Sequence, residues 1–93
     1  MRKKDKFLEA LGGKTRLKIL ITLARSKEKE LTLYKLAKFS GIKKDAIRKN
    51  MPMLLETGLV IKKEYGAIKL YSLNKENPIV ESLIEFFIKT KLL

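Results

Sequence analysis

The stretch 31–60 constrains the fold more than any other part of the chain. Two short amphipathic helical patterns flank a turn centred on Gly41, and the second pattern ends at Gly58. Glycine adopts the left-handed backbone conformation that closes a helix, so each of these glycines predicts a helix end. Thr32 is placed to cap the first helix, because its hydroxyl can accept a hydrogen bond from a free N–H group of the first turn. We therefore expect two helices joined by a tight turn.

The remaining patterns complete one small domain of mixed helices and strands. Two β-prone runs flank Gly66 and predict a hairpin. Asn77 and Pro78 predict the start of a last helix, since asparagine caps a helix and proline fits its first turn. The expected helices are 6–11, 14–26, 33–39, 43–57 and one within 77–93; the expected strands are a very short one near 31–33 and the hairpin runs 60–64 and 68–73. The expected fold is α+β and mostly α, in the order α-α-(β)-α-α-β-β-α, with residues 1–93 in a single domain.

The charge of the chain limits its partners. It has 22 Lys and Arg against 10 Asp and Glu, a formal net charge of +12. Such an excess is larger than the solubility of a small domain requires, and it favours a nucleic acid or an anionic membrane surface. We favour nucleic acid, because a helix–turn–helix with a basic second helix is the geometry that enters a DNA major groove.

The second helix of the pair, 43–57, keeps a basic face after its apolar positions are turned inward. The side chains left on that face are Lys43, Lys44, Asp45, Arg48 and Lys49. Arg48 is the best candidate for a base contact, because a guanidinium pairs bidentately with guanine O6 and N7, while the lysines suit phosphates. Asn50 is able to read adenine but lies nearer the buried side. Pro52 removes one helical hydrogen bond and predicts a bend.

The expected hairpin adds a second basic surface. It carries Lys62, Lys63, Tyr65 and Lys69 around Gly66. Because neighbouring residues of a strand point to opposite faces, we expect only one of Lys62 and Lys63 to reach DNA. Tyr65 either packs against a sugar or caps the hairpin. Lys35 and Lys38, on the first helix of the pair, are further candidates for contacts with the DNA backbone.

Segments 14–20, 41–60 and 66–73 together resemble the winged helix-turn-helix superfamily, most closely ArsR-like archaeal regulators. The resemblance covers about residues 11–87. It implies that the helix after Gly41 is the recognition helix and that the hairpin is a wing along the minor groove or the adjacent backbone. Metal-sensing members of that group carry two cysteines where this chain has Thr32 and Tyr34. The chain has no cysteine and no histidine, so we expect no metal, no cofactor and no catalytic site.

The last helix carries apolar residues on more than one stripe. We expect Ile79, Leu83 and Phe86 to pack on the domain, and Val80, Ile84, Phe87 and Ile88 to project at an angle to them. A helix with more apolar surface than one core needs usually buries the rest against a partner. With Phe7 and Leu11 these four form the expected homodimer interface, so that 1–12 and 77–93 are the dimerisation helices. The alternative is that all of them fold into one core.

A two-fold dimer presents its recognition helices about one DNA turn apart, roughly 34 Å, and so predicts an inverted-repeat site. The expected function is sequence-specific binding of double-stranded DNA by a homodimeric transcriptional regulator, a repressor. A centromere-binding adaptor of plasmid or chromosome partition would use the same chemistry, and no residue separates the two. A nonspecific architectural DNA- or RNA-binding protein is a third possibility. With no leader pattern and no apolar run near the roughly 20 residues of a membrane span, we expect no membrane partner and a cytoplasmic location.

Overall fold

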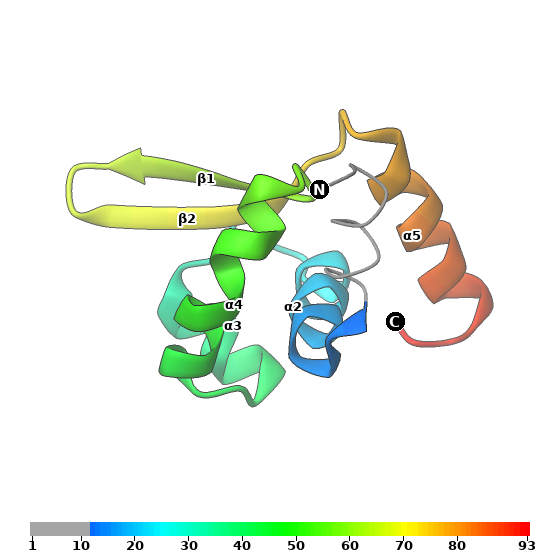
Figure 1. Ribbon diagram of the computed structural model, residues 1–93, viewed down its shortest axis with the longest axis horizontal. Coiled ribbons are helices and arrows are strands. Elements are labelled where there is room, and N and C mark those ends of the chain that lie inside the picture. The colour runs from blue at the N-terminus through cyan, green and yellow to red at the C-terminus, as the bar shows by residue number, and fades with distance from the viewer. Residues whose placement is uncertain (1–11) are drawn as a thin grey trace.

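Helix-capping residues set several of the element boundaries in the computed structural model, which describes residues 12–93. The elements are α2 (Lys14–Arg25), α3 (Leu33–Ser40), α4 (Lys44–Glu56), β1 (Val60–Tyr65), β2 (Ile68–Leu73) and α5 (Pro78–Lys89), as Figure 1 shows. This order confirms the predicted fold class for the described part of the chain. The helix expected at 6–11 lies outside the described residues.

The predicted caps form as expected. The Thr32 hydroxyl accepts a hydrogen bond from the Lys35 N–H at 3.2 Å, and the Asn77 side chain accepts one from the Ile79 N–H at 3.0 Å. Gly41 has φ 74° and donates its N–H to the Ala37 carbonyl, which closes α3. A residue with a Cβ would be strained in this left-handed conformation, so Gly41 fixes the tight turn into α4.

The core lies between α2, α3 and α4 and continues under the base of the hairpin. Its fully buried members include Ile19 and Leu20 of α2, Leu36 of α3, and Ile47 and Leu54 of α4. With Leu23 of α2 and Met51 of α4, the buried residues of these two helices fall at helical spacing, so one stripe of each faces the core. The basic side chains between them are left on the outside.

A one-residue bridge attaches the hairpin to the helices. Leu31 donates its N–H to the Tyr71 carbonyl at 2.9 Å and accepts from the Tyr71 N–H at 2.8 Å. This bridge is the very short strand expected near 31–33. Leu31 and Tyr71 are both buried, so the bridge holds the start of α3 against β2 and fixes the base of the hairpin beside the helix pair.

The hairpin extends beyond the helices (Figure 1) and has a two-residue tip. The strands pair antiparallel from Val60↔Leu73 to Tyr65↔Ile68, which leaves Gly66 and Ala67 as the loop. Gly66 has φ 62°, the positive value that a tight hairpin turn requires at its first loop residue.

Helix α4 continues through Pro52 to Glu56. Met51 and Leu54 on either side of the proline are buried, whereas Pro52 is exposed. Packing of the apolar stripe therefore maintains the helix where one backbone hydrogen bond is missing. The expected bend at Pro52 stays a prediction.

The burial of the residues on α5 contradicts part of the predicted dimer interface. Val80 and Phe87 are each 1% exposed, whereas Phe86 is 54% and Ile88 60% exposed. The expectations that Val80 and Phe87 project away from the core and that Phe86 packs on it were therefore wrong. Val80 and Phe87 lie seven residues apart, two helical turns, so they share the inward stripe, and each preceding residue is rotated about 100° away from it. Ile84 is half-buried, and Phe7 and Leu11 lie outside the described residues.

None of the helices within residues 12–93 is long and apolar enough to span a membrane.

Candidate nucleic-acid interface

The first turns of α4 expose a basic surface. Because Ile47, Met51 and Leu54 are buried, the orientation of α4 about its own axis is fixed. The predicted residues Lys44, Asp45, Arg48 and Lys49 are all exposed on the remaining face, and Lys43 is exposed at the N-cap position just before the helix. The structure therefore brings the five predicted recognition-helix residues to one end of α4.

Arg48 and Asp45 form an ion pair on this surface. The distance from Arg48 Nη1 to Asp45 Oδ1 is 3.0 Å, and the two side chains are 61% and 96% exposed. An ion pair this exposed contributes little free energy, because water and salt screen it. The guanidinium can therefore leave the carboxylate for a stronger partner at small cost.

Lys44 stacks on Tyr34 across the turn between the two helices. Its Nζ lies 5.2 Å from the centroid of the Tyr34 ring, within the range of a cation–π contact. Sequence reasoning assigned no such role to Tyr34. The contact depends on the angle at which α3 and α4 cross, and no spacing in the sequence reveals that angle.

An open groove separates α4 from the hairpin. Thr32, Leu33, Tyr34 and Arg48 line one side of it, and Ala67, Ile68, Lys69 and Tyr71 line the other. Its volume is about 460 Å³. Arg48 and Lys69, 21 positions apart in the sequence, thus border the same groove.

The two faces of the hairpin differ in what they present. Lys62, Lys69 and the buried Tyr71 share the face that packs towards the helices, whereas Lys63 and Tyr65 lie on the other face. Lys62 pairs with Glu64 at 3.1 Å, and Lys63 Nζ lies 3.9 Å from Glu30 Oε2. The predicted divergence of Lys62 and Lys63 is confirmed, and Lys62 is the one on the side of the groove.

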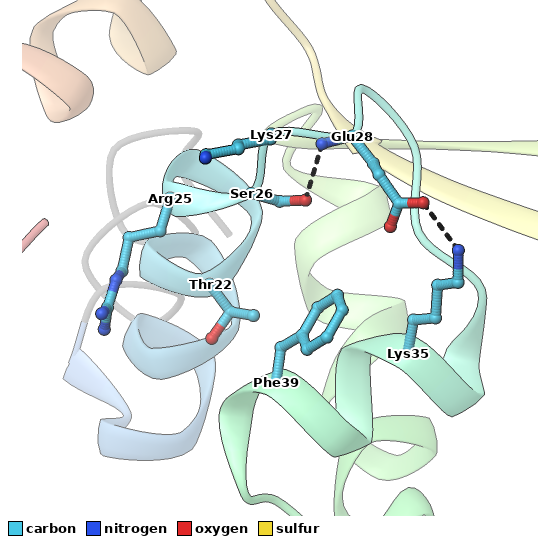
Figure 2. Close-up of a pocket in the computed structure, with 7 residues that line it drawn as sticks. All are labelled: Thr22, Arg25, Ser26, Lys27, Glu28, Lys35 and Phe39. Carbon is cyan, nitrogen blue, oxygen red and sulfur yellow. Dashed lines mark hydrogen bonds and ion pairs between the residues drawn. The ribbon is translucent and has the colours of Figure 1, made fainter.

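The two candidate lysines of α3 lie on different sides of that helix. Lys38 lies one helical turn after Tyr34 and so shares the side of α3 that borders the groove. Lys35 instead donates to Glu28 Oε1 at 2.6 Å and lines a different cleft, between α2 and α3 (Figure 2). The structure does not bring Lys35 to the groove with Arg48 and Lys69.

Asn50 has a structural role. Its Oδ1 accepts a hydrogen bond from Arg16 Nη1 at 2.9 Å, and its Nδ2 donates to the Ala46 carbonyl at 2.7 Å. Both ends of the amide are therefore engaged within the domain, and the side chain links α2 to α4. This agrees with its expected position near the buried side, and we expect no base contact from it.

The described residues offer no obvious metal site. Between residues 12 and 93, no three Asp, Glu, Cys or His side chains gather closely enough to hold a metal ion.

Comparison with known proteins relates this geometry to solved structures. No protein-family model matches the sequence, and no curated protein matches it either. The structure of HlyU from Vibrio cholerae N16961 is similar over 98% of this chain and 94% of its own, with 23% identity and a TM-score of 0.78. The transcriptional repressor BigR from Xylella fastidiosa is similar over 97% and 96%, with 19% identity and a TM-score of 0.75. A predicted DNA-binding transcriptional regulator from E. coli is similar over 94% and 87%, with 22% identity and a TM-score of 0.75.

The fold is a winged helix. In it α3 and α4 form the helix–turn–helix, and the hairpin β1–β2 is the wing. At these identities the likeness establishes the fold alone, so the partner has to be argued from the residues of this chain.

Proposed function

We propose that this winged-helix protein is a transcriptional regulator that binds double-stranded DNA, with α4 in the major groove and the wing beside it. The observation that carries the proposal is the groove that Arg48 and Lys69 border together. One guanidinium at the exposed start of a helix and one lysine on the facing hairpin offer a base contact and a backbone contact from two elements. Two of the similar structures are described as a transcriptional repressor and as a DNA-binding transcriptional regulator, which supports this function.

The charges around the groove fit a polyanion. Lys43, Lys44 and Lys49 are exposed at the start of α4, and Lys62 and Lys69 lie on the groove side of the wing. Each phosphate that a cation neutralises releases a counterion, so the logarithm of the binding constant is expected to fall by about 0.9 per contact for each decade of salt. Five such contacts in each protomer predict a slope of roughly −4 to −5 per protomer.

The protein is further proposed to act as a homodimer on an inverted repeat, in the manner of a repressor. Phe86 and Ile88 leave large apolar side chains on the outside of α5, and Leu92 and Leu93 follow them in an exposed C-terminal segment. Exposed apolar residues on both flanks of the last helix and in the segment after it favour a second copy as the partner. Two α4 helices related by a two-fold axis would then meet successive major grooves of a palindromic site.

Selection from a randomised duplex library, followed by fluorescence anisotropy, tests the proposal. We expect an inverted repeat to be enriched and to bind at least about 10³-fold more tightly than a scrambled duplex of the same length. Equal affinity for both duplexes would instead identify a nonspecific architectural protein. Footprints at rising protein concentration then separate a regulator, which protects a discrete site, from a partition adaptor, whose protection extends along the DNA.

A further inference from the structure

A second cleft lies on the side of α3 away from the groove, and the proposed DNA contacts leave it unused. It is bordered by the end of α2, by the loop 26–28 and by α3, and its volume is about 560 Å³ (Figure 2). Sites for small organic ligands typically have about 300–1,000 Å³. We call this site the α2–α3 cleft.

An aromatic side chain forms one wall of the α2–α3 cleft. Phe39 is 54% exposed, and Figure 2 shows its ring between Thr22 and Lys35, below the loop that carries Glu28. Thr22 directs its hydroxyl to the Lys18 carbonyl at 2.8 Å, so that polar group is already bonded within α2. The wall therefore offers a planar apolar surface against which a flat ligand can stack.

The charged residues around this wall are mainly cationic. Arg25, Lys27 and Lys35 line the cleft together with a single carboxylate, that of Glu28. Glu28 is engaged by Lys35 at 2.6 Å, whereas neither Arg25 nor Lys27 has an ion-pair partner among residues 12–93. Arg25 also offsets the partial negative charge at the end of α2, and Figure 2 shows the Lys27 side chain extending to the Arg25 side, away from Phe39, so Lys35 is the cation nearest the ring.

We infer that the α2–α3 cleft binds a small aromatic carboxylate, with its ring on Phe39 and its carboxylate on Lys35. In this arrangement the ligand competes with Glu28 for the Lys35 ammonium. Both carboxylates accept from one cation, so the resident carboxylate weakens the binding of the ligand. The inference goes beyond the proposed function and does not depend on DNA binding.

Because the ligand competes with Glu28, one substitution at this position distinguishes an anionic ligand from a cationic one. Glu28→Gln removes a negative charge from the cleft and leaves Lys35 available, so an anionic ligand should bind about threefold more tightly. A cationic aromatic ligand would need the Glu28 carboxylate and the Phe39 ring, and the same substitution would weaken it. The two ligand classes therefore predict opposite changes.

Titration of the full-length ¹⁵N-labelled protein with 1-naphthoate, followed by amide chemical shifts, tests the inference without any DNA. We expect saturable shifts at residues 22–39 and no saturable shifts with 1-naphthylmethylamine. Phe39→Ala should weaken naphthoate at least about tenfold because it removes the stacking surface. Ile61→Ala is the matched control, since Ile61 is also an exposed apolar residue but lies on β1, away from the cleft, and it should leave binding unchanged.

Three results would each overturn the inference. They are the absence of saturable naphthoate shifts in the cleft, tighter binding of the amine than of naphthoate, and weaker naphthoate binding by Glu28→Gln. A failure of DNA selection would leave all three measurements unaffected, so the two proposals fail separately.

Discussion

Replacing Asp45 with asparagine should strengthen DNA binding while it slightly weakens the fold. Asp45 pairs with Arg48 at 3.0 Å on the exposed face of α4. A duplex that takes the Arg48 guanidinium has to displace this carboxylate, and its phosphates repel the same negative charge. The isosteric amide removes both obstacles and keeps the shape of the side chain.

The exposure of the pair sets the size of the effect. At 61% and 96% exposure the two side chains are largely solvated, and such a pair is worth at most about 1 kcal/mol. That free energy corresponds to roughly a fivefold change in a dissociation constant, so we expect Asp45→Asn to tighten binding about two- to fivefold. Asp45 also lies in the first turn of α4, where a carboxylate stabilises a helix by about 0.3–1 kcal/mol. Urea unfolding should show a loss of that size.

Fluorescence anisotropy with the selected duplex and a scrambled duplex measures the affinity. Glu81→Gln is the matched control, because Glu81 occupies the first turn of α5, away from the groove. It should lower stability by a similar amount and change DNA affinity no more than one surface charge does. If Asp45→Asn instead weakens binding to the selected duplex, the carboxylate itself contacts a base, such as the amino group of cytosine, and the competition argument is refuted.

Four further variants, one of them a double substitution, test other parts of the protein. Arg48→Ala should weaken binding to the selected duplex by about 1–3 kcal/mol and relax the sequence preference at one base pair. Unchanged sequence preference would show that α4 does not lie in the major groove. Lys69→Gln should weaken binding to all duplexes alike and reduce the slope of the salt dependence by about 0.9. Phe86→Ser combined with Ile88→Ser should convert dimer to monomer in sedimentation, and a persistent dimer would place the interface elsewhere. Asn50→Ala should lower the free energy of unfolding by about 1–2 kcal/mol in urea and leave DNA preference unchanged; altered preference would restore Asn50 as a base reader.

The boundaries of the elements were predictable because their causes are local. Thr32, Gly41 and Asn77 act on backbone groups within a few residues of themselves, so a short window of sequence contains the whole argument. The reversal of the chain at Gly66 was predictable in the same way, but the expected connection 65–67 is one residue shorter, because Tyr65 pairs with Ile68. These four positions fix where α3 begins and ends, where α5 begins, and where the chain reverses in the wing.

The wrong or missing predictions concern residues whose position depends on packing between elements. Helix α5 is apolar over more than half its circumference, so the stripe through Val80 and Phe87 and the neighbouring stripe through Ile79 and Phe86 read equally well as the inward face. The bond from Arg16 to Asn50 joins residues 34 positions apart and exists only because α2 and α4 pack side by side. No short stretch of sequence indicates which stripe of α5 faces inward, or that Arg16 bonds to Asn50.

Helix α3 is the one element shared by the two sites, and this limits how they can influence each other. Tyr34 and Lys38 lie on its groove side, while Lys35 and Phe39 line the α2–α3 cleft. A ligand in the cleft changes DNA affinity only if it binds one position of α3 better than another. The bridge between Leu31 and Tyr71 ties the start of α3 to the wing, and the bond between Arg16 and Asn50 ties α2 to α4. Any coupling therefore has to reach the groove through Leu31, through the turn at Gly41 or through the bond from Arg16 to Asn50, and a ligand that shifts none of these leaves DNA binding unchanged.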